Sequence, residues 1–327
     1  MDGSSPLITN DAAVLGVLCI VLAVVFGTAS SERPGLRKFY KYVPTILLCY
    51  FIPAVLSNLG IFSAERSNLY LFTSRYLLPA CLVLLTLSID LKEVMRLGPR
   101  MLTMFLTGTI GIVIGGPIAI LFISLFSPET VGGQGPDAVW RGLTTVAGSW
   151  IGGGANQAAM KEVFEVGDEI FATLVAVDVI IANIWLAILL FMAGNSEYFD
   201  RKNYADTSEI EHLQQKMAEY KAQIDRIPSM ADTMKILAAG FGITGVAHLA
   251  GNFLSSAIES SYPGLSKFSL TSEFFWIVVI ATTGGLALSF TPARRLEGAG
   301  ASRIGSVFLY LLVASIGMKM NVSSVVE

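Results

Sequence analysis

Residues 142–160, GLTTVAGSWIGGGANQAAM, form an uncharged run that is almost long enough to cross a bilayer yet poor in large apolar side chains. Four of its five glycines, Gly148, Gly152, Gly153 and Gly154, lie within seven residues. Each glycine inside a helix costs about 1 kcal/mol relative to alanine, so the run makes a poor lipid-facing helix. We therefore expect a broken helix or a re-entrant hairpin, buried where the rest of the protein can satisfy its freed backbone groups.

The composition of the whole chain places this run in a membrane protein. Of the 327 residues, 53% are hydrophobic and 14% are charged, whereas soluble domains carry about 25% charged residues. This balance excludes an ordinary cytosolic enzyme, a secreted disulfide scaffold and a disordered chain. The net charge of −3, without a basic block, excludes nucleic acid as a partner. The three cysteines lie in apolar runs and show no metal-ligand spacing, so we expect neither a disulfide nor a transition-metal site.

Apolar runs of the length that crosses a bilayer, about 20 residues, occur throughout the chain. They occupy residues 12–31, 42–64, 101–128, 236–258 and 274–293, with one at 170–196 interrupted only by Asp178 and shorter ones at 76–89 and 304–318. The N-terminal residues are acidic, unlike those of a signal peptide, so the first run is expected to stay as a span. The sequence predicts an all-α, multi-pass protein of the cell (inner or plasma) membrane.

The basic residues indicate how these spans are oriented. The links after the first and third spans hold four and three lysines and arginines, and the link after the second holds two. Basic links face the cytoplasm, and those at 201–235 and 294–303 should do so as well. This requires an odd number of crossings before residue 197, where six apolar segments lie. If residues 142–160 dip in and return, five crossings remain and the charges agree.

Five crossings before a cytoplasmic loop would invert the second half of the chain relative to the first. Such inverted repeats are the plan of many secondary transporters, and residues 87–95 align weakly with residues 319–327. We divide the chain into a first membrane repeat (1–196), a polar loop (197–232) and a partial second repeat (233–327). The second repeat's counterpart of the glycine run would lie beyond Glu327, so we expect the second repeat to be truncated.

The polar loop contains one amphipathic pattern. Apolar residues recur there at alternating spacings of three and four, which predicts a cytoplasmic helix over residues 208–227: Ile210, Leu213, Met217, Tyr220, Ile224 and Ile227. It could form a coiled coil that joins two copies in a homodimer or binds another partner. Alternatively, it is a linker helix that lies on the protein's own cytoplasmic face or on the membrane.

Asp178 is the most informative single residue, because at least six uncharged residues flank it on either side. A carboxylate at bilayer depth costs at least about 2.5 kcal/mol and needs a partner or a water-filled site. We interpret Asp178 as part of a cation or proton site. The alternatives are a carboxylate near the interface or one neutralised by a structural hydrogen bond. Asn183 is a second polar residue in the same run.

The glycine run offers complementary ligands. A broken helix frees carbonyl groups that coordinate Na⁺ and exposes a helix N-terminus that attracts anions. Close packing through small residues is the alternative explanation of the glycines. The candidate cation- and substrate-binding residues are Ser149, Gly152, Gly153, Gly154, Asn156, Gln157, Asp178 and Asn183.

Two stretches together, GSWIGGGANQAAMKEVF (148–164) and VAVDVIIANIWLAILL (175–190), resemble the YjcL-like membrane family, and LLPACLVLLTLSIDLKEVMRLGPR (77–100) extends the likeness. That family is similar to the cation/proton antiporter and anion transporter superfamily, which includes sodium–glutamate and bile acid–sodium symporters. The resemblance implies a two-repeat fold whose core domain, holding the glycines and Asp178, moves against a scaffold domain. Two features depart from the pattern. Gly154-Ala155-Asn156 stands where Ser-Ala-Asn is expected, and the second repeat's motif does not occur in these 327 residues.

These observations predict a secondary active transporter of a small organic anion, with Na⁺ or H⁺ as coupling ion and no other cofactor. One alternative is a cation/proton antiporter without an organic substrate. Another is a non-transporting membrane scaffold that recruits partners through residues 208–227. An enzyme is not expected, because the helices carry no Ser/His, Cys/His or metal constellation.

Overall fold

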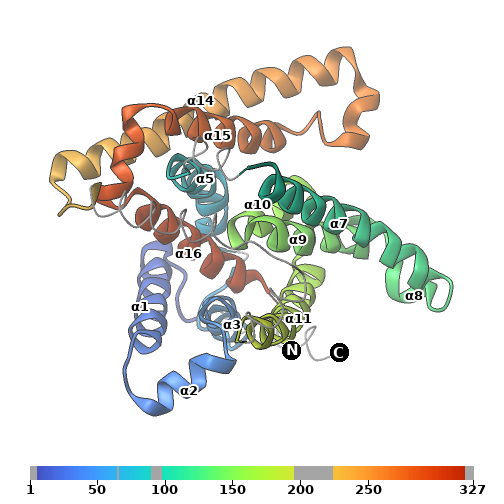
Figure 1. Ribbon diagram of the computed structural model, residues 1–327, viewed down its shortest axis with the longest axis horizontal. Coiled ribbons are helices and arrows are strands. Elements are labelled where there is room, and N and C mark those ends of the chain that lie inside the picture. The colour runs from blue at the N-terminus through green and yellow to red at the C-terminus, as the bar shows by residue number, and fades with distance from the viewer. Residues whose placement is uncertain (1–5, 65, 90–97, 195–223, 321–327) are drawn as a thin grey trace.

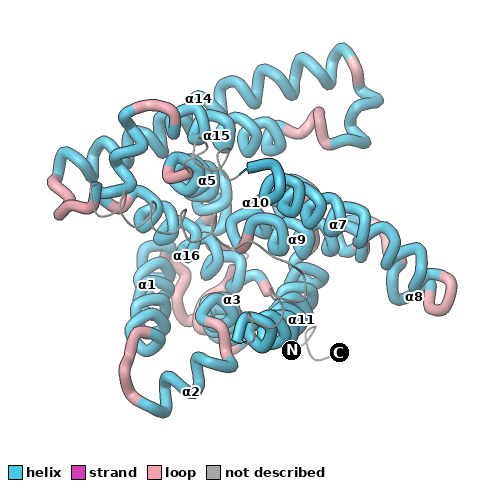
Figure 2. Tube along the Cα trace, viewed as in Figure 1, coloured by secondary structure: helices cyan, strands magenta, loops and turns pink. Residues whose placement is uncertain are grey.

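The fold was analysed in a computed structural model, which describes residues 6–64, 66–89, 98–194 and 224–320. Helices joined by short connections make up this part of the chain (Figures 1 and 2). Within it, extended pairing is limited to one isolated bridge between Ile8 and Phe62. The predicted all-α class is therefore confirmed.

The helices before the polar loop are α1 (Asp11–Ala29), α2 (Pro34–Tyr42), α3 (Thr45–Asn58), α4 (Leu69–Phe72), the π-helical turn η1 (Thr73–Leu77), α5 (Leu78–Leu87), α7 (Gly98–Ser124), α8 (Pro128–Val131), η2 (Gly135–Asp137), α9 (Val139–Gly152), α10 (Gly154–Val163) and α11 (Asp168–Gly194). Those after it are α14 (Met230–Ser261), η3 (Pro263–Phe268), α15 (Glu273–Ser289), η4 (Pro292–Ala299) and α16 (Ala301–Lys319).

In the described residues, six helical stretches are long and apolar enough to cross a membrane. They are α1, the continuous helix Leu69–Leu87, α7, α11, α14 and α16. Two helix pairs bend sharply, by 87° between α2 and α3 and by 96° between α15 and η4, and would bring the number to eight if each pair were one span. The predicted multi-pass membrane protein is thus confirmed, and its inverted repeat stays a prediction.

Helix α5 lies at the centre of the protein, where α14, α15 and α16 pack against it (Figure 1). Glycines allow the close approach that membrane helices favour. A Cβ atom at Gly285 would lie 2.1 Å from the Thr86 hydroxyl oxygen, and one at Gly317 would lie 2.3 Å from the Tyr50 carbonyl oxygen. The segments on either side of the polar loop therefore share one core.

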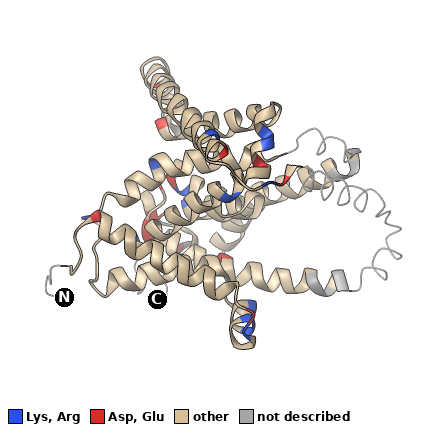
Figure 3. Ribbon diagram, turned by 90° about the vertical axis from the view of Figure 1, so that its left-hand side faces the viewer, with Lys and Arg blue, Asp and Glu red and all other residues tan. Residues whose placement is uncertain are grey.

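The outer helices present apolar side chains to their surroundings. None of the most apolar stretch of α7 is buried, and acidic and basic residues occupy only short parts of the helical ribbons in Figure 3. Such a surface suits contact with lipid. The predicted amphipathic helix at 208–227 lies mostly outside the described residues, which resume at Ile224, and residues 225–229 are not helical.

Candidate functional site

The glycine run forms two helices that meet at Gly153. Helix α9 ends at Gly152 and α10 begins at Gly154. Between them Gly153 has φ +81° and ψ −170°, a conformation that is essentially restricted to glycine. The Gly153 amide donates to the Ser149 carbonyl at 2.7 Å, and the Gln157 amide donates to the Gly153 carbonyl at 3.1 Å. The predicted break in the helix is therefore present and lies at Gly153, and the re-entrant course of the run stays a prediction.

Two glycines on α9, Gly148 and Gly152, allow close packing against α10. Helices α9 and α10 lie against each other. A Cβ atom at Gly148 would lie 3.0 Å from the Asn156 carbonyl oxygen, and one at Gly152 would lie 1.8 Å from the Asn156 side-chain nitrogen. The Asn156 amide thus lies against one side of Gly152, and a side chain at this position would displace it. On α10, a Cβ atom at Gly154 would lie 3.0 Å from Ile46 of α3.

The Asp178 carboxylate joins the two sides of this break. It extends from α11 and is only 7% exposed. The Trp150 indole Nε1 of α9 donates to its Oδ1 at 2.6 Å, and the Gln157 Nε2 of α10 donates to its Oδ2 at 3.3 Å. Trp150 precedes Gly153 and Gln157 follows it, so one carboxylate holds both helices. The structure thus brings together two of the predicted site residues, Asp178 and Gln157.

Trp150 was not among the predicted site residues, although a signal for it was present. An indole N–H is a donor that needs a partner when its ring is partly buried. Trp150 also stands within the glycine run itself. Which acceptor it would meet depends on how α9 faces α11, and that orientation is not readable from spacing along the chain.

Asn183 is not brought to the carboxylate. Its side-chain Nδ2 donates to the Val179 carbonyl of its own helix at 2.7 Å. Five residues separate it from Asp178, which places it about 140° around the helix. Its amide is thus satisfied locally, and we do not assign it to the site.

A second polar cluster, which sequence reasoning missed, lies at the far end of α10. Lys161 is 4% exposed, and its Nζ lies 2.8 Å from Asp168 Oδ1. The same Nζ donates to the Tyr70 hydroxyl at 3.1 Å, and that hydroxyl donates to Glu162. Lys319 Nζ lies 3.0 Å from Asp168 Oδ2. These five residues form one network that joins α4, α10, α11 and α16.

The charges of this network suit the helix ends that carry them. Lys161 and Lys319 lie in the last turns of α10 and α16, and Asp168 lies in the first turn of α11. Helix dipoles favour cations at C-termini and anions at N-termini. In the sequence, each of these charged residues resembles one that lies at the membrane interface. The pairing of Lys319 with Asp168 depends on a contact between distant segments, so the sequence alone does not reveal it.

Replacing Gly153 by alanine is expected to destabilise the protein by about 1–3 kcal/mol. The added Cβ would meet nothing within 4 Å, so the cost is conformational and not steric. Gly116→Ala is the matched control, because Gly116 also has open space but lies inside α7. Reversible unfolding in mixed micelles should show a loss for Gly153→Ala alone. Equal stabilities of the two variants would contradict the requirement for glycine at position 153.

These features define a multi-pass helical membrane protein with a buried carboxylate across a broken helix. The chain belongs to the DUF819 family, described as a protein of unknown function, whose model matches residues 16–327. It is also 27% identical over 164 residues to the "Uncharacterized membrane protein YjcL" of Bacillus subtilis (strain 168), an alignment that covers 48% of this chain and 37% of that relative. No solved structure matches. The YjcL-like family assignment is confirmed, and its relation to the antiporter superfamily stays a prediction.

Proposed function

We propose that the protein is a secondary active transporter of the cell membrane, which moves a small organic anion coupled to H⁺ or Na⁺ by alternating access. The observation that carries this proposal is the buried Asp178 carboxylate, which accepts hydrogen bonds from both sides of the Gly153 break. Ionisable groups inside membrane helices are costly and typically mark ion or substrate pathways.

The hydrogen-bond donors around Asp178 would make the packing of α9 and α10 against α11 depend on the charge of its carboxylate. An ionised carboxylate only accepts hydrogen bonds, and here each oxygen meets an N–H group. Protonation would turn one oxygen into a donor. The Trp150 indole cannot accept a hydrogen bond. A proton on the oxygen that faces Gln157 would leave the Trp150 hydrogen bond intact, whereas a proton on the other oxygen would break it. Proton uptake would therefore either break the hydrogen bond between α11 and one side of the break or require the Gln157 amide to rotate so that its oxygen accepts.

Na⁺ would act on the same group with a different ligand set. It would compete with the two donors for the Asp178 oxygens, and rotation of the Gln157 amide would present its oxygen to the ion. The last carbonyl groups of α9 lack partners further along that helix, apart from that of Ser149, which accepts from the Gly153 amide. Either ion would thus change what holds α9, α10 and α11 together, as a coupled transporter requires.

The break also supplies a site for an anion. It places the C-terminus of α9 next to the N-terminus of α10, and these ends carry partial charges of opposite sign. Gly152 and Gly153 are exposed, so both helix ends are accessible to a solute. A cation at the one end and a carboxylate group at the other would match a symporter of an organic anion. We include in this proposal that residues 142–160 enter and leave the membrane on the same side and that the two membrane segments form an inverted repeat.

Gradient-driven uptake by the full-length protein in proteoliposomes tests the proposed function. We expect an inward H⁺ or Na⁺ gradient to accelerate the uptake of at least one compound in a panel of radiolabelled mono- and dicarboxylates and amino acids. The controls are liposomes without a gradient and liposomes without protein. Proton movement driven by Na⁺ or K⁺ in the absence of any carboxylate would identify an antiporter. No flux under any gradient would contradict a transport function.

A further inference from the structure

A groove of about 620 Å³ opens between α14 and the bend from α15 to η4, away from the Gly153 break. One wall is a stripe of small or apolar residues on α14, formed by Ala239, Gly242 and Val246. They recur three and four residues apart and so share one helix face. Leu288 contributes to the opposite wall. A Cβ atom at Gly242 would meet nothing within 4 Å, so glycine keeps this part of the groove open.

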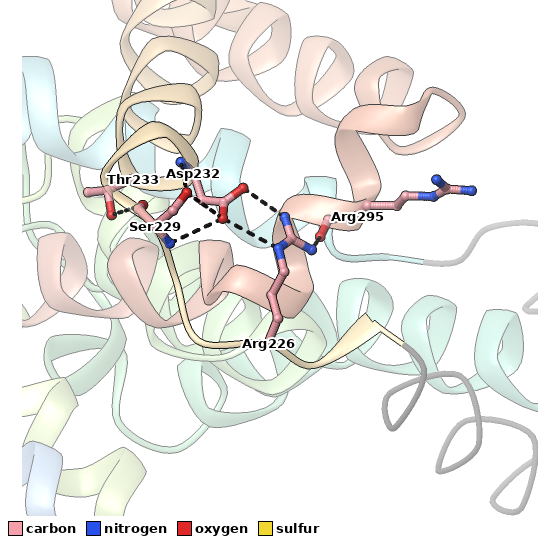
Figure 4. Close-up of polar contacts among 5 residues, drawn as sticks. All are labelled: Arg226, Ser229, Asp232, Thr233 and Arg295. Carbon is pink, nitrogen blue, oxygen red and sulfur yellow. Dashed lines mark hydrogen bonds and ion pairs between the residues drawn. The ribbon is translucent and has the colours of Figure 1, made fainter.

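One end of the groove is basic. Lys235 lies one turn before Ala239, on the same face of α14, and Arg226 and Arg295 complete this end. The single acidic residue there, Asp232, is already neutralised. The Arg226 guanidinium donates to its two carboxylate oxygens at 2.9 and 3.4 Å, and also to the Arg295 carbonyl at 2.9 Å (Figure 4).

Two cations therefore remain for a ligand. Lys235 and Arg295 are exposed, and within the described part of the chain neither forms an ion pair. The Arg295 side chain extends away from the Arg226–Asp232 pair (Figure 4). The N-terminus of α14, capped by Ser229, adds its positive dipole end to this side of the groove.

We propose that this groove binds an anionic phospholipid. The phosphate would meet Lys235 and Arg295, and one acyl chain would lie along Ala239, Gly242 and Val246. From Lys235 to Val246 the helix rises about 16 Å, close to the half-thickness of about 15 Å of a bilayer's hydrocarbon core. Charge complementarity favours this occupant, because basic pockets between membrane helices at the cytoplasmic side bind anionic head groups.

Lipid binding to the intact protein in a neutral detergent tests this site. The probes are radiolabelled dimyristoyl phosphatidylglycerol and its zwitterionic counterpart, dimyristoyl phosphatidylcholine. Each basic residue near the head group contributes about fivefold in affinity. The combined change Lys235→Gln and Arg295→Gln should therefore weaken phosphatidylglycerol binding by about 25-fold and leave phosphatidylcholine binding unchanged. Lys38→Gln with Arg303→Gln removes two exposed charges outside the groove and should have no effect.

The apolar part of the groove has its own matched pair of variants. Gly242→Phe would fill the groove and should reduce the binding of both lipids. Gly245→Phe adds the same side chain to an equally open position on α14 outside the groove and should not. Equal affinities of the two lipids for the unmodified protein, equal effects of the two glycine variants, or full displacement of phosphatidylglycerol by glycerol phosphate at the lipid's own affinity would each overturn the proposal.

Discussion

Replacing Asp178 by asparagine is expected to reduce gradient-driven uptake to the level of protein-free liposomes. Asparagine has nearly the same shape as aspartate but carries no charge and takes up no proton. Its amide offers one oxygen and one NH₂ group to a pocket in which both Trp150 Nε1 and Gln157 Nε2 are donors. One side of the break therefore keeps its hydrogen bond only if the Gln157 amide rotates so that its oxygen accepts. Whichever arrangement forms no longer responds to ions, so the ion gradient has no group left on which to act.

Exchange measurements separate this effect from misfolding. With substrate on both sides and no ion gradient, a carrier that has lost only its ion coupling should still exchange labelled for unlabelled substrate. We therefore expect Asp178→Asn to retain exchange while losing accumulation. Accumulation at the unmodified rate would remove Asp178 from the site.

Asn183→Ala is the matched control for Asp178→Asn. Asn183 is another polar residue in the apolar run of α11, but its amide donates to the Val179 carbonyl within the same helix. Its loss should leave both exchange and gradient-driven uptake unchanged. A loss of uptake equal to that of Asp178→Asn would show that the arrangement of hydrogen bonds described above does not define the site.

The sequence predicted those parts of the site that depend on composition and local conformation. Four glycines in seven residues predict a break wherever they occur, and a lone carboxylate in an apolar run predicts a partner. Both predictions concern what a segment cannot do, namely continue as a regular helix or leave a charge alone in lipid. They hold whatever the neighbouring helices are. For that reason, both the break at Gly153 and the pairing of Asp178 could be predicted from the sequence.

What the sequence did not predict depends on which helix faces surround a residue. Asn183 is close to Asp178 along the chain but lies on a different side of α11, so nearness in sequence was misleading. Trp150 and Lys319 are close to acidic groups only after α9 and α16 have packed. The groove on α14 likewise requires η4 to turn back by 96° at the end of α15. Contacts of this kind are set by the tertiary packing of the helices and leave no periodic signal.

The two polar clusters hold the α9–α10 hairpin in different ways. At the break, Asp178 accepts hydrogen bonds from neutral donors on two helices. One helical turn beyond Gln157, Lys161 connects α10 to the start of α11 through a charged network that also reaches α16. The break is therefore joined by a carboxylate that neutral donors hold, while the opposite end of α10 is held by ion pairs. This asymmetry predicts that the two clusters differ in function: Asp178 variants should change transport, and variants of the network should change stability.

Replacing Asp168 by asparagine is accordingly expected to destabilise the protein by about 3 kcal/mol, because it strands a buried cation. Lys161, 4% exposed, would keep only the Tyr70 hydroxyl as a hydrogen-bond acceptor from this network. The effect should fall at the lower end of the range for buried pairs, since Asp168 itself is 28% exposed. Lys319→Met should cost less than about 1 kcal/mol, because Lys319 is 31% exposed and can be replaced by water at Asp168.

A double-mutant cycle distinguishes this ion-pair network from simple packing. Lys161→Met removes the buried cation while Asp168 keeps Lys319, and combining it with Asp168→Asn removes both buried charges at once. Replacing both members of a buried pair is often nearly neutral. We therefore expect the double variant to be more stable than Asp168→Asn alone, as measured by reversible unfolding in mixed micelles. Additive losses would mean that Lys161 and Asp168 stabilise the protein independently, and the network would then carry no coupling between α10, α11 and α16.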